Sequence, residues 1–369
     1  MSTTDRPDAS APAASDVAAQ LRDADFLRLV AAPTGDALAA AGLLSRAVDG
    51  PFQATVAAFP SDAERATEAD CTLGLGLDVG DVTVTDPPLS RLAFAAADTL
   101  GGADPWLALA GAVAAGAEPS GAPLEAAGPE RRPGLAVPTA DPADGLAHTT
   151  LAHGSFSGDR EAAAAALGDA EGSDGADEER SRRRASLVAL TVAAESTPRG
   201  ATAVERLLRP YVGGPVRTVG GHADVLEALA RTQPGLGVAL AAGAGDREAA
   251  LEAWRAHGRR AHAALAAATT ARYDGVLVAR CEPGDRTDSG VPLGTVARLL
   301  AQYRSPEPVA LAVADGRAAA HAPTDTDAGR VTAAAADVAG GTAAGTGQAA
   351  RARFRADTTE FAVAFREAL

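Results

Sequence analysis

The sequence predicts an α/β protein in which an N-terminal parallel-sheet domain is joined by a long helix to a smaller α/β C-terminal domain. Its length of 369 residues suits two domains. Up to Ala115, short apolar segments of strand length alternate with segments of helix length, which is typical of a parallel sheet covered by helices. A long helical pattern begins at Arg247, and strands and helices alternate again beyond it.

The N-terminal elements follow in order from Leu27. Apolar segments bounded by turn residues predict strands, and apolar residues that recur every three or four positions predict helices. On this basis we expect strands at residues 27–32, 52–59, 71–77 and 82–85, and helices at 37–47, 61–68, 89–100 and 105–115.

The middle of the chain is predicted to be mostly helical. Pro, Gly and Glu dominate residues 119–133, which we expect to form a loop. Residues 168–181 are acidic and run into four arginines, which indicates a solvated insertion between helices, although a functional basic patch is the alternative. Helices are expected at 182–194, 203–208 and 224–231.

The C-terminal part is predicted to be a separate α/β unit. The connecting helix at 246–271 has Leu251, Trp254 and Leu265 spaced as an apolar stripe. The C-terminal domain then covers residues 272–369. We expect strands at 273–280, 309–313, 330–335 and 349–356, and helices at 293–303 and 358–369.

The remaining N-terminal boundaries follow from composition. Residues 1–20 are rich in Ser, Thr, Asp, Ala and Pro and lack the features of a signal peptide, so we expect a disordered tail before an N-terminal domain at 21–245. No apolar run approaches the ~20 residues that a membrane-spanning helix needs.

The charge balance limits the class of protein. The chain carries 33 basic residues, all of them Arg, against 48 acidic residues, for a net charge of −15. This excludes a basic protein that coats nucleic acid, and two distant cysteines exclude a disulfide-built secreted domain. The lack of Lys, Ile and Asn is typical of a GC-rich genome. A carboxylate-rich surface is typical of a cytoplasm at molar salt. We therefore expect a halophilic, cytoplasmic protein.

The loop after the first strand carries the strongest functional signal. In open α/β sheets, ligands bind where such loops leave the strands. Residues 30–44 resemble the first motif of the DHH phosphoesterase superfamily, in particular the archaeal RecJ-like exonucleases, in which a strand ends in His-x-Asp-x-Asp. On that pattern, Ala32 replaces the His, Thr34 replaces the first Asp, and Asp36 is kept.

The later motifs resemble the same family in the same order. Asp86-Pro87-Pro88 stands where the family has Asp-His-His, and Ala115 or Gly116 where it has a metal-binding Asp. Residues 134–138 and 145–158 resemble the end of the family's N-terminal core. In residues 340–351, Thr346 stands where the family's Gly-Gly-His loop has its His.

The resemblance implies a DHH-like fold with a degenerate active site. The family hydrolyses phosphodiesters with two Mn²⁺ or Mg²⁺ ions, which need several carboxylate or imidazole ligands. Only Asp36 and Asp86 remain, so we expect no catalytic residues and no metal cofactor. The local alternative is that Asp36 caps the helix that it precedes and that Asp86 shapes a turn.

Three arginines are candidates for contact with nucleic acid. Arg351, Arg353 and Arg355 alternate along an expected strand, so they share one face beside the loop that holds substrate in the family. The alternative is an exposed polar strand face. We expect Gly220-Gly221-His222 to begin a helix, and we expect no metal site at His148 and His153.

The resemblance implies a pseudoenzyme that acts as a scaffold in DNA replication or repair. RecJ-like proteins of this superfamily associate with the GINS complex and the MCM helicase, so these are the expected partners, together with single-stranded DNA. Two alternatives stay open. One is an active metal-dependent, single-strand-specific exonuclease or phosphoesterase with an atypical site. The other is a regulatory protein that binds a nucleotide or another protein.

Overall fold

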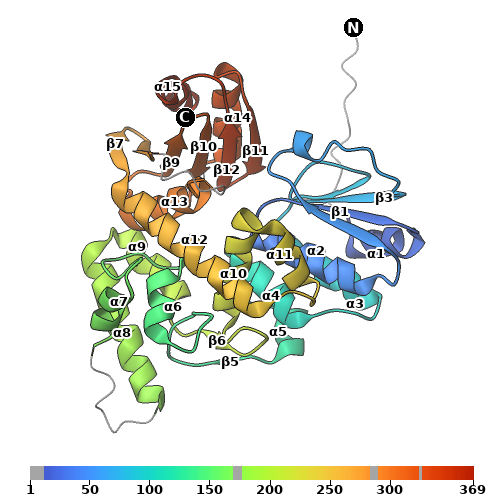
Figure 1. The fold of residues 1–369 in the computed structure, drawn as a ribbon, viewed down its shortest axis with the longest axis horizontal. Helices are drawn as coiled ribbons and strands as arrows, with labels where there is room; N and C mark the ends of the chain where they lie inside the picture. Colours follow the sequence, from blue (N-terminus) through green and yellow to red (C-terminus); the bar gives the residue numbers. More distant parts are fainter. Residues whose placement is uncertain (1–11, 169–176, 283–289, 324–325) are drawn as a thin grey trace.

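The N-terminal sheet is parallel and positions the candidate site. The computed structural model describes residues 12–168, 177–282, 290–323 and 326–369 (Figure 1). The sheet has the strand order β2-β1-β3-β4. Every residue of β1 and β3 is buried, because helices cover both faces of this sheet. Its strands are β1 (Leu27–Ala31), β2 (Phe52–Val56), β3 (Cys71–Leu75) and β4 (Val82–Val84).

Helices pack around this sheet and continue into a helical layer. Helix α2 lies at the centre and contacts α3, α4, α10 and α11. The helices of this region are α1 (Ala14–Asp23), α2 (Gly35–Ala47), α3 (Leu89–Thr99), α4 (Pro105–Ala114), α10 (Val219–Thr232) and α11 (Pro234–Ala241), with the 3₁₀ turn η1 (Pro60–Asp62).

The middle of the chain forms a helical layer that packs against one face of the C-terminal sheet (Figure 1). It contains α5 (Ala122–Ala127), α6 (Pro142–His148), α7 (Arg160–Leu167), α8 (Asp177–Glu195), α9 (Pro198–Ala203) and the 3₁₀ turn η3 (Val204–Arg206). The short strands β5 (Glu130–Arg131) and β6 (Tyr211–Val212) pair antiparallel beside it.

Helix α12 (Arg247–Ala267) leads from this body to the C-terminal sheet (Figure 1). Its Trp254 is fully buried in the N-terminal core, and its Leu265 is 1% exposed in the core of the helical layer. The apolar stripe predicted for this helix therefore joins the two cores.

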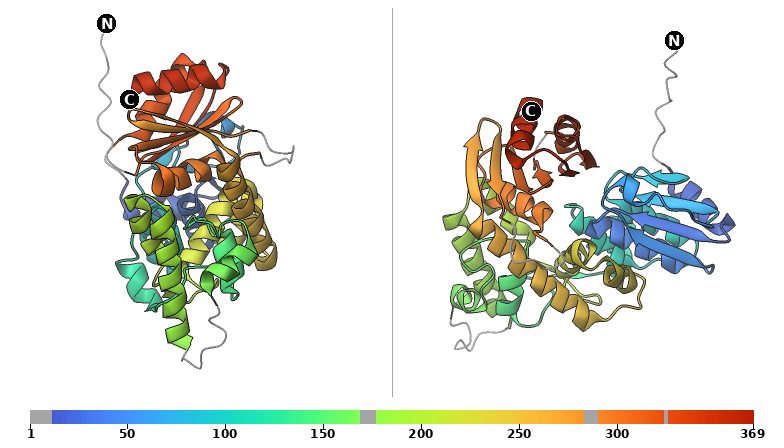
Figure 2. Two further views of the ribbon diagram at one scale, coloured as in Figure 1. Left: turned by 90° about the vertical axis from the view of Figure 1, so that its left-hand side faces the viewer. Right: turned by 45° about the horizontal axis from the view of Figure 1, so that its top comes forward.

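The C-terminal domain is a six-stranded sheet with the order β11-β12-β10-β9-β8-β7. Helices α14 and α15 cover one face, while α13 lies on the face toward the helical layer (Figure 2). The elements are β7 (Thr269–Tyr273), β8 (Val276–Arg280), α13 (Leu293–Leu299), the π-helical η4 (Leu300–Arg304), β9 (Val309–Ala314), β10 (Arg317–His321), α14 (Ala328–Val338), β11 (Thr342–Thr346), β12 (Ala349–Arg353) and α15 (Thr358–Ala368).

The predicted fold class is confirmed, because a four-stranded parallel sheet and a separate C-terminal sheet are both present. The strands expected at 27–32, 71–77 and 82–85 are present with shorter ends. Among the helices in the described ranges, none combines the length and the apolarity that crossing a bilayer requires.

Two predictions near the N-terminus are wrong in part. Residues 1–11 lie outside the described residues, but α1 covers 14–20 of the predicted tail, because Val17 and Ala18 bury an apolar face. The helix expected at 61–68 is only the turn η1, after which residues 64–69 form no regular element.

In the middle of the chain, residues 169–176 of the predicted acidic insertion lie outside the described residues, whereas 177–181 begin α8. The loop expected at 119–133 contains α5 and β5.

The C-terminal domain departs from the prediction in several places, and strands β10 and β11 were not expected at all. The connecting helix ends at Ala267, and β7 and β8 form a hairpin where one strand was expected, because Asp274-Gly275 makes a tight turn with a φ of 83° at Gly275. Residues 330–335 belong to helix α14, whose buried Ala328, Val331 and Ala335 follow a helical period.

Candidate functional site at the domain junction

The loop after β1 builds the entry to helix α2. Ala32 is buried, and the Thr34 side chain caps α2, accepting a hydrogen bond from the Ala37 amide at 3.2 Å. At Gly35 the helices come so close that an added Cβ would lie 2.9 Å from the Ala114 Cβ of α4. Glycine therefore lets the first turn of α2 lie against α4.

Asp36 uses both carboxylate oxygens to cap helix α3. It is 3% exposed and accepts hydrogen bonds from the amides of Leu89 (2.7 Å) and Ser90 (3.0 Å). Burial raises the pKa of Asp36 to about 6, although these hydrogen bonds oppose the shift. Asp36 therefore caps α3. It does not cap α2, the helix that we expected it to precede and cap, because the Thr34 side chain caps α2.

A second carboxylate, which the sequence analysis missed, lies beside Asp36. Glu227 of α10 accepts a hydrogen bond from the Gly35 amide at 2.5 Å, and its negative charge contributes to the raised pKa of Asp36. It also forms an ion pair with Arg231, one helical turn further along α10. The signal in the sequence was the Glu-to-Arg spacing of four residues.

The residues at this position do not fit a pair of divalent ions. Both oxygens of Asp36 already accept amide hydrogen bonds, Thr34 caps a helix, and Asp86 is exposed. Pro88 stands at the start of α3 and offers no ligand atom in its side chain. Within the described ranges, no three His, Cys, Asp or Glu side chains converge as metal ligands would.

Three arginines from separate elements gather close by, and we call Arg206, Arg231 and Arg298 the arginine cluster. A Cβ added at Gly116, one of the two positions at which the resemblance places a metal-binding Asp, would lie 3.7 Å from both terminal nitrogens of Arg206. Arg231 reaches α13, since its Nε lies 3.5 Å from a Cβ added at Gly294. The cluster therefore places positive charge at this end of α4.

His321 at the end of β10 reports on the cluster. Burial lowers the pKa of His321 to about 3, and the charges of Arg298, Arg206 and Arg231 lower it further. The charges of all three guanidinium groups therefore act on this one imidazole. The C-terminal sheet and the N-terminal domain therefore meet at a cationic junction.

Arg298 is tied to a buried hydrogen-bond network. The Asp224 carboxylate accepts from the Thr149 hydroxyl (2.9 Å), the Thr150 hydroxyl (2.6 Å) and the Trp254 indole (2.8 Å). Arg298 donates to the same Thr150 hydroxyl at 2.8 Å. This network fixes Arg298 relative to α10 and α12.

Arg351 and Arg353 connect the two domains. Arg351 donates to the Ala58 carbonyl at 2.5 Å, and Arg353 donates to Asp62 (2.8 Å) and Ser61 (2.7 Å). Both guanidinium groups lie over the Phe59 ring, so they share one face of β12 as predicted. Their contact with nucleic acid stays a prediction.

The third arginine of that set lies apart, since Arg355 is exposed and follows the end of β12. Thr346, which stands where the family has its His, is the last residue of β11.

The histidines singled out in the sequence have structural partners. His222 lies in the first turn of α10, which confirms that Gly220-Gly221-His222 begins a helix. His148 ends α6 and contacts the Asp144 carbonyl at 2.9 Å, whereas the His153 ring contacts His262 at 3.2 Å. Burial lowers the pKa of His153 to about 3, so this pair is neutral near pH 7.

Comparison with known proteins places the chain in a family. A family model described as the C-terminal domain of the uncharacterized protein rrnAC1427 matches residues 268–367. The uncharacterized protein rrnAC1427 of Haloarcula marismortui is 52% identical over 380 residues, covering 100% of each chain. The chain belongs to the rrnAC1427 family. Its matched domain begins just before β7, which agrees with the end of α12 at Ala267.

Solved structures of similar fold extend the comparison beyond the rrnAC1427 family. CDC45 from Entamoeba histolytica aligns with a TM-score of 0.53 at 10% identity, over 95% of this chain and 97% of that chain. The exonuclease RecJ bound to manganese aligns with a TM-score of 0.45 at 15% identity, over 97% and 93%. At such identities, the likeness to CDC45 shows a shared fold.

Proposed function

We propose that this protein is a catalytically degenerate, RecJ-like member of the DHH superfamily that holds single-stranded DNA at its domain junction without cutting it. One observation carries the proposal. At the position where the resemblance to the DHH superfamily would put two metal ions, Asp36 and Glu227 accept amide hydrogen bonds, and Arg231 of the arginine cluster pairs with Glu227.

The chemistry of the cluster suits a phosphodiester backbone. Guanidinium groups bind phosphate oxygens in a bidentate manner and stay charged at every physiological pH. Arg206 is exposed and has no ion-pair partner within the described ranges. Without a metal-activated water, bound phosphate would be held and not hydrolysed.

The proposed role is a scaffold in DNA replication or repair. Its proposed partners are the GINS complex and the MCM helicase, which follow from the resemblance to RecJ-like proteins. The fold shared with CDC45 supports this superfamily assignment. Affinity purification of the tagged chain from its own cells, followed by mass spectrometry, tests the partners. Cells that yield no GINS or MCM subunit would contradict them.

Fluorescence anisotropy with a labelled single-stranded oligonucleotide tests DNA binding. We expect Arg206→Gln and Arg298→Gln each to weaken binding and to reduce the salt slope by about 0.7 for each phosphate that the variant no longer neutralises. Arg259→Gln removes an exposed arginine of α12 outside the cluster and serves as the matched control. Equal weakening in the control would show that binding is not located at the cluster.

A nuclease assay separates the scaffold from an atypical exonuclease. With Mn²⁺ present, we expect no release of nucleotides from single-stranded DNA. Release that is abolished in Asp36→Ala would establish the enzyme and refute the proposal.

A further inference from the structure

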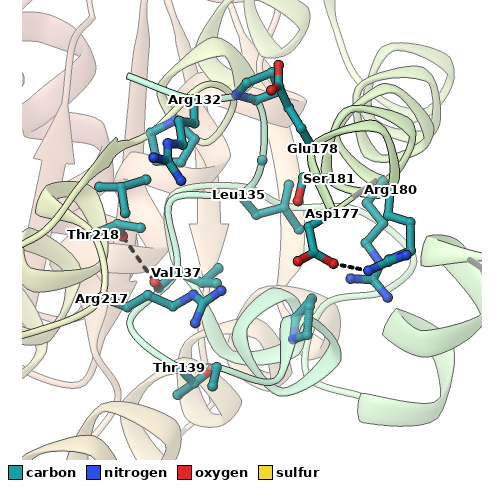
Figure 3. A pocket seen from close by; sticks show the side chains of 17 residues that line it. Arg132, Leu135, Val137, Thr139, Asp177, Glu178, Arg180, Ser181, Arg217 and Thr218 are labelled. Atoms are coloured by element: carbon teal, nitrogen blue, oxygen red, sulfur yellow. Dashed lines mark hydrogen bonds and ion pairs between the residues drawn. The ribbon is translucent and has the colours of Figure 1, made fainter. Parts of the chain in front are cut away.

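A second group of arginines lines a pocket in the helical layer. The pocket has a volume of about 530 Å³ and lies between α8, the segment before α6 and the loop before α10 (Figure 3). We call it the arginine pocket, and its charged lining residues are Arg132, Asp177, Glu178, Arg180, Arg184 and Arg217.

The walls of the pocket are held by backbone contacts. Helix α8 presents Asp177, Ser181 and Arg184, which lie on one face because they are four and three residues apart. On the opposite side, the Arg132 amide donates to the Pro210 carbonyl at 3.2 Å, and the Thr218 hydroxyl donates to the Val137 carbonyl at 3.0 Å. These two hydrogen bonds join the segments that face α8 across the pocket.

The charges in the pocket do not balance. Arg180 pairs with Asp177 (Figure 3), and Arg132 pairs with Glu130. Glu178 is bound by Arg182 at 3.1 Å, outside the lining. Those pairs leave two further arginines on the walls.

Arg184 and Arg217 are these remaining arginines. In the part of the chain that the structure describes, neither has a carboxylate partner, and the buried Nε of Arg184 has no hydrogen-bond acceptor. Guanidinium groups without a carboxylate partner are available to an anionic ligand. Two uncompensated positive charges on a protein with a net charge of −15 indicate an anion.

We propose that the arginine pocket binds a small organic phosphate, such as a nucleoside monophosphate or a sugar phosphate. Arg184 and Arg217 would hold the phosphate group, to which guanidinium groups are well matched. The apolar wall formed by Pro133, Leu135 and Val137 would contact the organic part. The volume lies in the range of about 300–1,000 Å³ that is usual for small-molecule sites and far exceeds a bare phosphate ion.

Calorimetric titration of the full chain tests this site independently of the DNA proposal. The probes are adenosine monophosphate, glucose 6-phosphate and inorganic phosphate, in concentrated potassium glutamate so that chloride does not compete. We expect saturable binding of at least one organic phosphate, roughly tenfold or more tighter than that of inorganic phosphate.

Substitutions then locate the binding. Arg184→Gln and Arg217→Gln should each weaken it by about tenfold or more. Arg183→Gln, which changes an exposed arginine next to Arg184 that does not line the pocket, should bind as the native chain does. Circular dichroism checks the fold, and Arg217 is exposed, so at least this variant is expected to fold.

Three results of the phosphate titrations would overturn the proposal. They are the absence of saturable binding by every probe, equal affinity for inorganic phosphate, and native affinity in both pocket variants. Binding of a single-stranded oligonucleotide alone, abolished in Arg184→Gln, would assign the pocket to a nucleic-acid surface and would likewise refute it.

Discussion

Asp36→Asn tests whether the ionised, buried carboxylate of Asp36 lowers the free energy of unfolding. Burial raises the pKa of Asp36 from 3.8 to about 6 in the folded protein. The folded state therefore binds more protons than the unfolded state between these two pH values, so stability falls as pH rises through this window. At 1.36 kcal/mol per pKa unit, the total change is about 3 kcal/mol.

The asparagine variant removes this pH dependence. Its side chain is always neutral, but its amide nitrogen would face a backbone N–H donor of Leu89 or Ser90, which costs about 1–3 kcal/mol at every pH. Relative to this variant, the native protein should therefore gain up to about 3 kcal/mol in free energy of unfolding as pH falls from 7 to 4. Titrating groups that do not interact with Asp36 cancel in the difference between the two proteins.

Urea unfolding followed by circular dichroism, at several pH values between 4 and 7, measures this difference. Asp86→Asn is the matched control, because Asp86 is exposed and its substitution should change stability by less than about 0.5 kcal/mol. A difference between native protein and Asp36→Asn that stays constant over the pH range would refute the reasoning.

Three further predictions concern packing and the domain junction. Gly258→Ala should destabilise the protein by about 3 kcal/mol or more, because the added Cβ would lie 2.0 Å from the His148 carbonyl oxygen. Urea unfolding measures this loss. Gly235→Ala is the control and should not destabilise the protein, because open space surrounds Gly235. Asp224→Ala should cost about 3 kcal/mol or more, since it leaves the Thr149, Thr150 and Trp254 donors without their acceptor; a loss under about 1 kcal/mol would contradict this. In a double-mutant cycle of Arg353→Ala and Phe59→Ala, thermal unfolding should give a coupling energy of about 0.5–1 kcal/mol, because the Arg353 guanidinium group stacks on the Phe59 ring. Additive effects of the two substitutions would show that this contact contributes nothing to stability.

The parallel sheet could be predicted from the sequence because its strands are buried on both faces. Residues 27–31 and 71–75 are almost uniformly apolar, as central parallel strands are. In contrast, the pattern at 330–335 favoured a strand because Val331 and Thr332 are β-branched, although their helical neighbours decide the outcome. The Asp274-Gly275 dipeptide is typical of a hairpin turn. We nevertheless missed the first strand of the hairpin, because most of its residues were assigned to the end of the long helix before it.

The candidate site could be predicted only in its local part. Asp36 was singled out by the resemblance of residues 30–44 to the first motif of the DHH superfamily, but its hydrogen-bond partners are amides from a different helix. The arginine cluster comes from η3, α10 and α13, which are far apart in the sequence. No local pattern shows that the charges of Arg206, Arg231 and Arg298 act on His321, because only tertiary packing relates these elements.

The C-terminal module, although recognisable as a unit in sequence, depends on the rest of the chain. One face of its sheet and Tyr303 of η4 are buried with residues of the helical layer, and the Tyr303 hydroxyl donates to the Leu151 carbonyl at 2.5 Å. An excised fragment of residues 268–367 would expose this apolar face to water and self-associate. The C-terminal domain therefore needs the helical layer to stay folded and soluble. On heating, we expect the two domains to unfold in a single transition.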